Sequence, residues 1–119
     1  MATIAIVDDN PDNLKLVRAV LTRAGHRVTE FATGVGFAAL AATDPPDLVL
    51  LDLELPDLDG FGVLAELRRL PERLQVVAVT AHASPEDQAL ARQAGFDAFI
   101  SKPIDIATFP DQVRRLLPA

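Results

Sequence analysis

Apolar and polar positions along the chain form two alternating patterns. Five short runs rich in Val, Ile and Leu have the length of β-strands, at residues 4–7, 28–31, 48–53, 76–79 and 98–100. Between these runs, apolar residues recur three or four positions apart, as at Leu14, Val17 and Leu21, which is the spacing of one helix face. Strict alternation of helices with almost wholly apolar strands predicts a doubly wound α/β fold, in which helices cover both faces of a parallel sheet.

Turn-forming residues fall where the helices are expected to begin and end. The pairs at 10–11 (Asn-Pro) and 84–85 (Ser-Pro) each place a capping residue before a proline that suits the first helical turn. Gly25 and Gly95 follow helical segments, where glycine commonly closes a helix. Because Pro110 would interrupt a helix interior, we expect the last helix to begin late, with Thr108 as its N-cap and Asp111 completing a capping-box-like pair.

Length and composition indicate one domain. With 119 residues, of which 50% are hydrophobic, the chain can bury its own core, and we expect a single domain over residues 1–119 without an output domain. The chain has no Cys, which excludes thiolate metal ligands and suits a reducing compartment. Neither a signal peptide nor an apolar run of about 20 residues is evident, so we expect a cytoplasmic protein with no membrane partner.

The charge balance argues against nucleic acid as a partner. A formal net charge of −6 leaves no evident surface for neutralising phosphates. We expect the scattered arginines to form solvated helix faces, namely Arg68, Arg69, Arg73, Arg114 and Arg115.

Residues suited to a functional site stand at the carboxyl ends of four of the five expected strands. They are Asp8 and Asp9 at the end of the first, Asp52 at the end of the third, Thr80 and the small residue Ala81 at the end of the fourth, and Lys102 shortly after the fifth. Ligands of open parallel sheets bind beyond the carboxyl ends of the strands. If the first and third strands are neighbours, three carboxylates converge there, and each close pair repels by about 4 kcal/mol at roughly 4 Å. Hard oxygen ligands with open positions suit Mg²⁺, or Mn²⁺ in its place.

Lys102 adds a fixed positive charge to this group of carboxylates. A carboxylate nucleophile, a divalent metal, a hydroxyl and an ammonium group together suit phosphoryl transfer, which depends on positioning and charge neutralisation. We therefore expect Asp52 to accept a phosphoryl group as an acyl phosphate. Taken separately, each residue has an ordinary alternative: a helix cap for Asp8-Asp9, a strand residue for Thr80, and a solvated loop residue for His82.

A further group of acids, Asp57 and Asp59, fits the later positions of a calcium-binding loop together with Gly60 and Glu66. The first ligand position would then be Leu55, and a strand rather than a helix precedes it, so the EF-hand interpretation fails. We expect both aspartates to solvate the loop and to favour the start of the following helix through its dipole.

Four segments in order resemble the receiver domains of two-component response regulators (CheY-like). They are IVDDN at 6–10, PDLVLLDLELPDLDG at 46–60, VVAVTAHA at 76–83 and GFDAFISKPI at 95–104. The resemblance implies a flavodoxin-like (βα)5 fold with sheet order 2-1-3-4-5. It also implies that Asp52 is the phosphoacceptor and that Mg²⁺ is held by Asp8, Asp9, Asp52 and the backbone carbonyl of Glu54.

The resemblance assigns further roles around the same site. It implies that the Thr80 hydroxyl moves to the phosphoryl oxygen, that Ala81 leaves room for phosphate, and that Lys102 pairs with the phosphoryl group. Phe99 matches an aromatic that turns inward on activation, although an ordinary core aromatic is the alternative. Glu54 and His82 match positions over the phosphate, and we expect them to tune autodephosphorylation.

The same resemblance implies the partners. A histidine kinase or a histidine-containing phosphotransfer protein would supply the phosphoryl group, and the fourth and fifth helices with the fifth strand would bind a downstream target. The chain would then be a monomer or a phosphorylation-dependent dimer. Two alternatives remain open: a metal-dependent phosphohydrolase that turns over at Asp52, and a receiver-like interaction module that works without phosphorylation.

Overall fold

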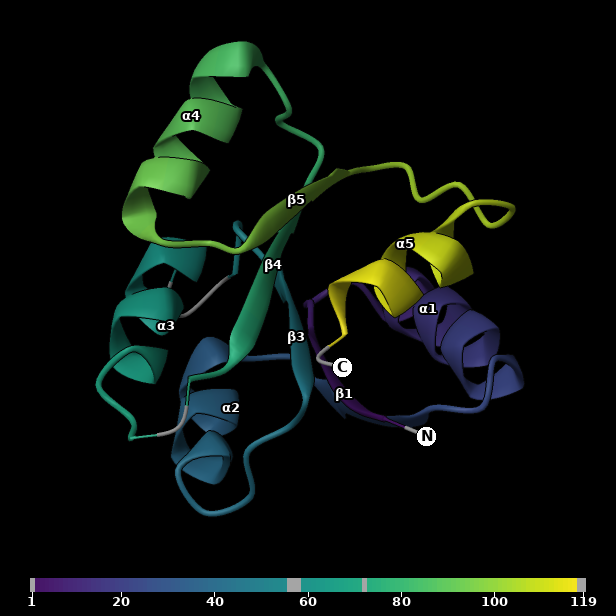
Figure 1. Cartoon of the computed structure of the whole chain (residues 1–119), viewed down its shortest axis with the longest axis horizontal. Helices are drawn as coiled ribbons and strands as arrows, with labels where there is room; N and C mark the ends of the chain where they lie inside the picture. The colour runs from purple at the N-terminus through teal and green to yellow at the C-terminus, as the bar shows by residue number, and fades with distance from the viewer. Residues whose placement is uncertain (1, 56–58, 72, 118–119) are drawn as a thin grey trace.

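The computed structural model describes residues 2–55, 59–71 and 73–117 as five parallel strands that alternate with five helices (Figure 1). In chain order they are β1 (Thr3–Val7), α1 (Pro11–Arg23), β2 (Arg27–Phe31), α2 (Gly34–Ala41), β3 (Leu48–Asp52), α3 (Gly60–Leu67), β4 (Gln75–Thr80), α4 (Pro85–Ala94), β5 (Ala98–Ser101) and α5 (Phe109–Leu116). The sheet order is β2-β1-β3-β4-β5, which confirms the expected doubly wound fold and places β1 beside β3. Within the described segments, no helix is both long and apolar enough to cross a membrane.

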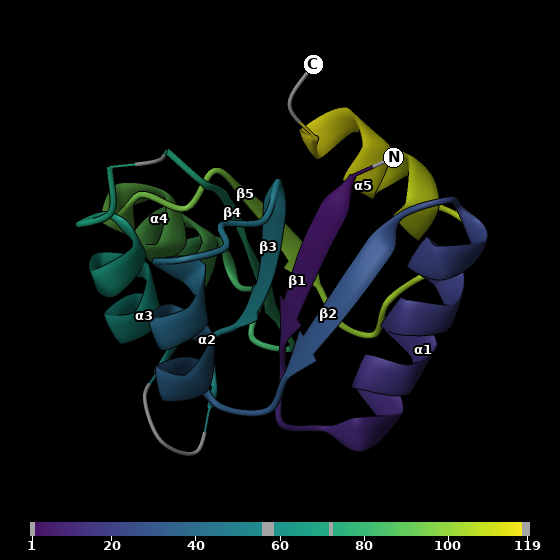
Figure 2. The ribbon, with the colours of Figure 1, turned by 90° about the horizontal axis from the view of Figure 1, so that it is seen from below.

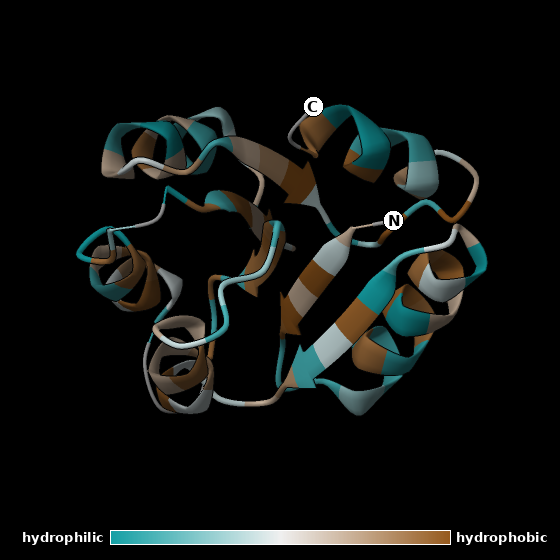
Figure 3. Ribbon diagram, turned by 60° about the horizontal axis from the view of Figure 1, so that its bottom comes forward, coloured by the Kyte–Doolittle hydropathy of each residue, from teal (hydrophilic) through white to brown (hydrophobic). Residues whose placement is uncertain are grey.

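The sheet lies between two layers of helices. Helices α2, α3 and α4 cover one face, whereas α1 and α5 cover the other (Figures 1 and 2). Each face has its own buried cluster: Phe37 and Leu64 belong to the first, and Leu21 and Phe109 to the second. Figure 3 shows the central strands as mainly hydrophobic, while the edge strand β2 mixes both characters, in line with its partly exposed residues.

Successive strand residues alternate between these two faces, as the pleat of a β-strand requires. In β3, Leu48 and Leu50 pack on the side of α1 and α5, and Val49 and Leu51 pack on the side of α2, α3 and α4. Every residue of β3 is buried. A strand buried on both faces explains why its sequence is continuously apolar instead of alternating.

Local capping chemistry sets most helix ends as expected. The Asn10 side chain accepts from the backbone N–H groups of residues 12 and 13, and Ser84 caps α4 in the same way, each followed by proline. Gly95 closes α4 at φ 111°, a left-handed conformation that glycine adopts without a Cβ clash. Asp59 caps α3 by accepting from Gly62 N at 2.8 Å, and Asp57 lies outside the described residues.

The start of α5 corrects one detail of the expectation. The helix does begin at Phe109, directly after Thr108, but Thr108 makes no side-chain cap hydrogen bond. Its backbone is already helical, whereas a capping residue is usually extended, and its hydroxyl donates instead to the carbonyl of Asp105. Asp111 forms an ion pair with Arg114 at 3.0 Å, so the capping-box pair is wrong.

Two arginines also differ from the expectation of solvated helix faces. Arg68 donates to the carbonyls of Leu74 and Gly95 and to the carboxylate of Asp97, and Arg73 pairs with the same carboxylate at 2.8 Å. Burial alone would raise the pKa of Asp97. Hydrogen bonds from Arg73, Val76 N–H and Arg68 outweigh it and hold that pKa below its usual value. The expectation fails here because these arginines tie the end of α3 to the starts of β4 and β5.

Candidate functional site

The carboxyl ends of β1 and β3 bring three aspartates together. Val7 pairs with Leu51 in the parallel register, so the residues that follow these positions emerge side by side. One carboxylate oxygen from each of Asp8, Asp9 and Asp52 lies within 4.8 Å of the others. Asp8 and Asp52 are only 5% and 6% exposed, whereas Asp9 is exposed. The grouping expected from the strand ends is therefore present.

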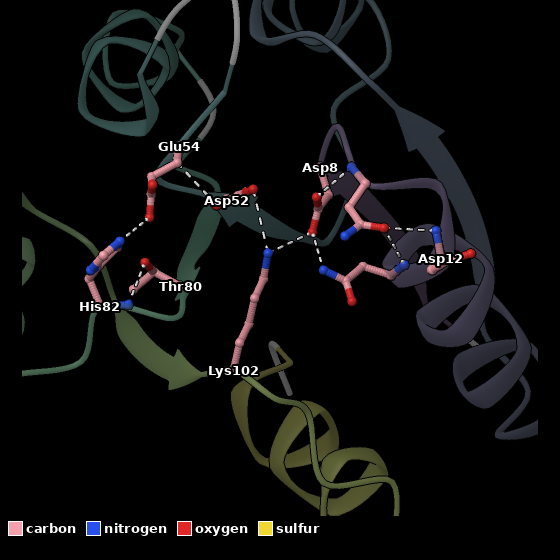
Figure 4. Close-up of polar contacts among 9 residues, drawn as sticks. Asp8, Asp12, Asp52, Glu54, Thr80, His82 and Lys102 are labelled. Carbon is pink, nitrogen blue, oxygen red and sulfur yellow. Dashed lines mark hydrogen bonds and ion pairs between the residues drawn. The ribbon is translucent and has the colours of Figure 1, made fainter.

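Lys102 reaches into this cluster from the segment after β5 (Figure 4). Its Nζ lies 3.0 Å from Asp8 Oδ2 and 3.5 Å from Asp52 Oδ2, and its side chain is 16% exposed. The Lys102 backbone N–H donates to the carbonyl of Thr80, which fixes the position of the segment relative to β4. Burial alone would lower the pKa of Lys102, but the hydrogen bond to Asp8 and the nearby carboxylate charges raise it above 10.5. Lys102 is therefore a charged partner for both buried aspartates.

The buried position of Asp52 disfavours the ionised form of its carboxyl group. Burial raises the pKa of its carboxyl above 3.8, and the charge of Asp8 adds to this. The backbone N–H of Glu54, which donates to Asp52 Oδ1 at 3.0 Å, and the Lys102 ammonium offset the rise only in part. The folded protein thus holds a carboxylate that is less stable as an anion than it is in water, as is common at functional sites.

From this raised pKa we expect the substitution Asp52→Asn to stabilise the metal-free protein near neutral pH. A raised pKa means that the folded state binds the Asp52 proton more tightly than the unfolded state. Wild type therefore loses stability as pH rises from 3.8 through the raised value, while the amide does not titrate. Urea denaturation in a chelator between pH 4 and pH 7 measures the gain. A gain that is the same at both ends of this range, or a loss at pH 7, would contradict the raised pKa.

Asp44→Asn is the matched control for that series. Asp44 is an exposed aspartate that follows α2, remote from the three clustered carboxylates. Its substitution removes one negative charge without relieving burial. We expect a change within about 0.5 kcal/mol, as for other surface positions.

Asp8 is held by donors that the sequence reasoning did not identify. The backbone N–H of Asn10 donates to Asp8 Oδ1 at 2.9 Å, and Asn13 Nδ2 lies 3.4 Å from Asp8 Oδ2. Asn13 stands in the first turn of α1, which starts directly after the aspartate pair. The sequence does show an amide side chain, Asn13, three residues after the N-cap Asn10. Whether that side chain contacts Asp8 depends on its rotamer, which the sequence does not specify.

Thr80 lies on the other side of the sheet from the lysine. In β4, Val76 and Ala78 pack toward α2, α3 and α4, and Thr80 continues that alternation, whereas Asp52 continues the side of Leu50. Thr80 is 1% exposed, and its hydroxyl accepts from the backbone N–H of His82 at 3.1 Å. Pleating thus divides the site into a carboxylate–ammonium half and a hydroxyl half.

The expected tuning residues form a contact of their own at the hydroxyl half. His82 Nε2 lies 2.9 Å from Glu54 Oε1, which joins the segments after β3 and β4 (Figure 4). Both side chains are mostly exposed, at 69% and 60%. Ala81, between Thr80 and His82, is exposed as well, and Phe99 on β5 is partly buried against the cluster beneath α2, α3 and α4.

The residues at this edge fit a divalent metal. Three carboxylates offer hard oxygen ligands, which Mg²⁺ prefers. Lys102 balances only part of their mutual repulsion. The site therefore keeps a net negative charge, which attracts a cation. The donor set contains neither sulfur nor imidazole, which would favour zinc.

Comparison with known proteins agrees with this geometry. Residues 4–114 match the family model of the response regulator receiver domain. The chain therefore belongs to the response regulator receiver domain family of two-component systems. Receiver domains are signalling switches rather than conventional enzymes, and they bind Mg²⁺ at an acidic site such as the one described above.

Individual relatives span almost the whole chain. The polar-differentiation response regulator DivK of Brucella ovis is 36% identical and is matched over 97% of this chain and 95% of its own length. The receiver domain of sensor histidine kinase PA1611 from Pseudomonas aeruginosa, solved with a magnesium ion coordinated in its active site cleft, is 32% identical with a TM-score of 0.88, covering 97% of this chain and 96% of that domain. The BeF3-activated receiver domain of Klebsiella pneumoniae RstA is 28% identical with a TM-score of 0.90, covering 98% and 99%.

Proposed function

We propose that this chain is a free-standing receiver that accepts a phosphoryl group on Asp52 from a histidine kinase or a histidine-containing phosphotransfer protein. The contact of Lys102 with both Asp8 and Asp52 carries the proposal, because it places a fixed positive charge beside the acceptor oxygen. The free-standing form is supported by the match to 95% of the length of DivK. A cytoplasmic location, suited to a chain without Cys, belongs to the same proposal.

The chemistry follows from the charges around Asp52. A carboxylate oxygen forms a bond to phosphorus as the bond between phosphorus and the donor nitrogen breaks, which leaves an acyl phosphate. Lys102 would neutralise phosphoryl oxygens from one side, and the Thr80 hydroxyl, which accepts from His82 N–H in this structure, would move to a phosphoryl oxygen after transfer. Mg²⁺, or Mn²⁺ in its place, would be held by Asp8, Asp9, Asp52 and the Glu54 carbonyl and would supply further neutralisation of phosphoryl charge.

A phosphohydrolase is the weaker alternative. Phosphatases that form an aspartyl phosphate need an acid–base group poised to activate water or protonate a leaving group. The candidate in this chain, Glu54, is 60% exposed and engaged with His82. Slow self-hydrolysis of the acyl phosphate fits this site better than steady turnover of phosphate esters.

The output of the switch is a shift between conformations that changes protein binding. We propose α4, β5 and α5 as the face that binds the downstream target, with Phe99 on β5 as the aromatic that responds. Phosphorylation-dependent dimerisation through the same face belongs to this proposal. A module that binds partners without phosphorylation is the alternative outcome.

Beryllium fluoride with Mg²⁺, a stable mimic of the phosphoryl group, tests the switch. We expect changes in the amide NMR signals of Thr80, His82 and residues of α4 and β5, and the substitution Asp52→Ala should abolish them. If the mimic binds but the changes stop at the residues next to Asp52, the phosphorylation-independent module becomes the better description.

The contact between Glu54 and His82 leads to a prediction about phosphate lifetime. It joins the segments that follow β3 and β4, and we expect the two side chains to shield the acyl phosphate from water. Removing both should then shorten the phosphate lifetime by about fivefold. The rate at which the phosphorylated Glu54→Ala, His82→Ala double variant loses its radiolabelled phosphoryl group measures this lifetime. Glu86→Ala, an exposed substitution in the first turn of α4, is the control. An unchanged lifetime in the double variant would exclude the tuning role.

A further inference from the structure

A groove between α3 and α4 opens beside the hydroxyl half of the site, and it shares only α4 with the proposed α4–β5–α5 output face. Its volume is about 320 Å³, near the lower end of the range of ligand pockets. It is lined by residues of α3, the end of β4, α4 and the segments that precede α3 and α4, namely Leu53, Glu54, Asp59, Phe61, Thr80, His82, Asp87 and Leu90. All of them lie in the described part of the chain.

The floor of the groove is apolar and well supported. Leu90 is 55% exposed on α4, and Phe61 is 37% exposed on α3. The ring of Phe61 stacks edge-on against Phe96, with centroids 5.7 Å apart, so the surface it presents is fixed. Leu53 packs partly against the core below. Two large apolar side chains exposed on either side of one hollow form a small anchor site for an apolar group.

The rim of the groove is acidic. Glu54, Asp59 and Asp87 line it, and His82 is the sole titratable base among the lining residues. Asp59 and Asp87 accept hydrogen bonds at the helix caps, from Gly62 N and Ser84 Oγ. Among the residues that the structure describes, neither forms an ion pair with Lys, Arg or His. By contrast, the hollow beside α1 is lined by three bases, Lys15, Arg18 and Arg23, and one acid, Glu30. The negative sign is therefore a property of the α3–α4 groove and not of the whole surface.

We propose that this groove binds a short segment of a partner protein in which one large apolar side chain is flanked by Lys or Arg. The apolar side chain would lie between Phe61 and Leu90, and the basic groups would face the acidic rim. Charge complementarity selects this occupant over an acidic or purely apolar one. Because Glu54, whose backbone N–H donates to Asp52 Oδ1, also lines the groove, the bound segment would contact a residue next to the acidic site. The proposal concerns binding alone and does not require phosphorylation of Asp52.

Three synthetic peptides test the proposal by NMR titration of the isotope-labelled full chain. The first carries a leucine between two arginine pairs, the second replaces the arginines with glutamates, and the third replaces the leucine with alanine. We expect the first to perturb the signals of Phe61, His82 and Leu90. We expect the other two to bind at least about tenfold more weakly, with the binding of the first also weakening as salt rises.

Matched variants distinguish binding in the groove from non-specific binding to exposed apolar side chains. Leu90→Ser removes a side chain that is 55% exposed in the groove, and Ile106→Ser removes one that is 54% exposed on another surface. Both should fold, since neither side chain is buried. Tenfold weaker binding in Leu90→Ser with unchanged binding in Ile106→Ser supports the proposal. Equal affinity for the arginine and glutamate peptides, signals perturbed elsewhere, or no binding at millimolar peptide would overturn it.

Discussion

The double substitution Asp8→Asn, Asp9→Asn should remove most of the stabilisation of this protein by Mg²⁺. Wild type at a Mg²⁺ concentration 100 times its Kd gains about 2.7 kcal/mol, which corresponds to a rise in Tm on the order of 10 °C. Removing two of the three clustered carboxylates leaves Asp52 alone with Lys102, so we expect the Kd to rise by about 100-fold or more. Thermal unfolding with Mg²⁺ and with a chelator measures both quantities.

Asp12→Asn is the control for this experiment. Asp12 is an exposed aspartate in the first turn of α1, close to the site in sequence but outside the carboxylate cluster. Its substitution should leave the Mg²⁺ shift intact. A double variant that keeps the full shift would show that Mg²⁺ binds elsewhere.

The substitution Lys102→Ala should have opposite effects on stability and on metal affinity. In a chelator it leaves Asp8 and Asp52 without their shared cation, and we expect a loss of about 2 to 3 kcal/mol. The raised pKa of Lys102 means that this contribution is complete at neutral pH and is lost only as pH rises through a value above 10.5. Because the unbalanced carboxylates then attract Mg²⁺ more strongly, we expect metal affinity to rise roughly tenfold.

Lys15→Ala provides the comparison, since Lys15 is the other lysine of the chain and is exposed on α1. We expect it to change neither quantity. The rate of phosphorylation should distinguish the role of Lys102 toward the metal from its role toward the phosphoryl group. We expect Lys102→Ala to be phosphorylated more slowly than wild type although it binds Mg²⁺ more tightly. If Lys102→Ala weakened Mg²⁺ binding, the lysine would be a structural support of the metal site and not its electrostatic competitor.

Much of this fold follows from the sequence because burial on both faces makes each central strand apolar throughout. The positions of Asp8, Asp52 and Lys102 follow in turn, since Asp52 ends β3 and the other two come directly after β1 and β5. Parallel strands end at one edge, so residues 44 positions apart in sequence, such as Asp8 and Asp52, are brought together by topology alone.

The features that the sequence did not reveal depend on side-chain direction. Asn13 could have pointed to solvent, and its contact with Asp8 depends on one rotamer. The pairing of Arg68 with Asp97 joins residues 29 positions apart, and no local pattern identifies it. Thr80 was correctly placed at a strand end, but the pleat directs it toward the α3 and α4 side, away from the carboxylates next to Lys102.

Intact-mass analysis after incubation with acetyl phosphate tests most directly whether Asp52 accepts a phosphoryl group. Wild type and Asp52→Ala are compared, each with Mg²⁺ and with a chelator. We expect wild type to gain the mass of one phosphoryl group only when Mg²⁺ is present, and the variant to gain nothing. An adduct of equal yield on Asp52→Ala, or no adduct on wild type in Mg²⁺, would contradict the assignment of Asp52 as the phosphoacceptor.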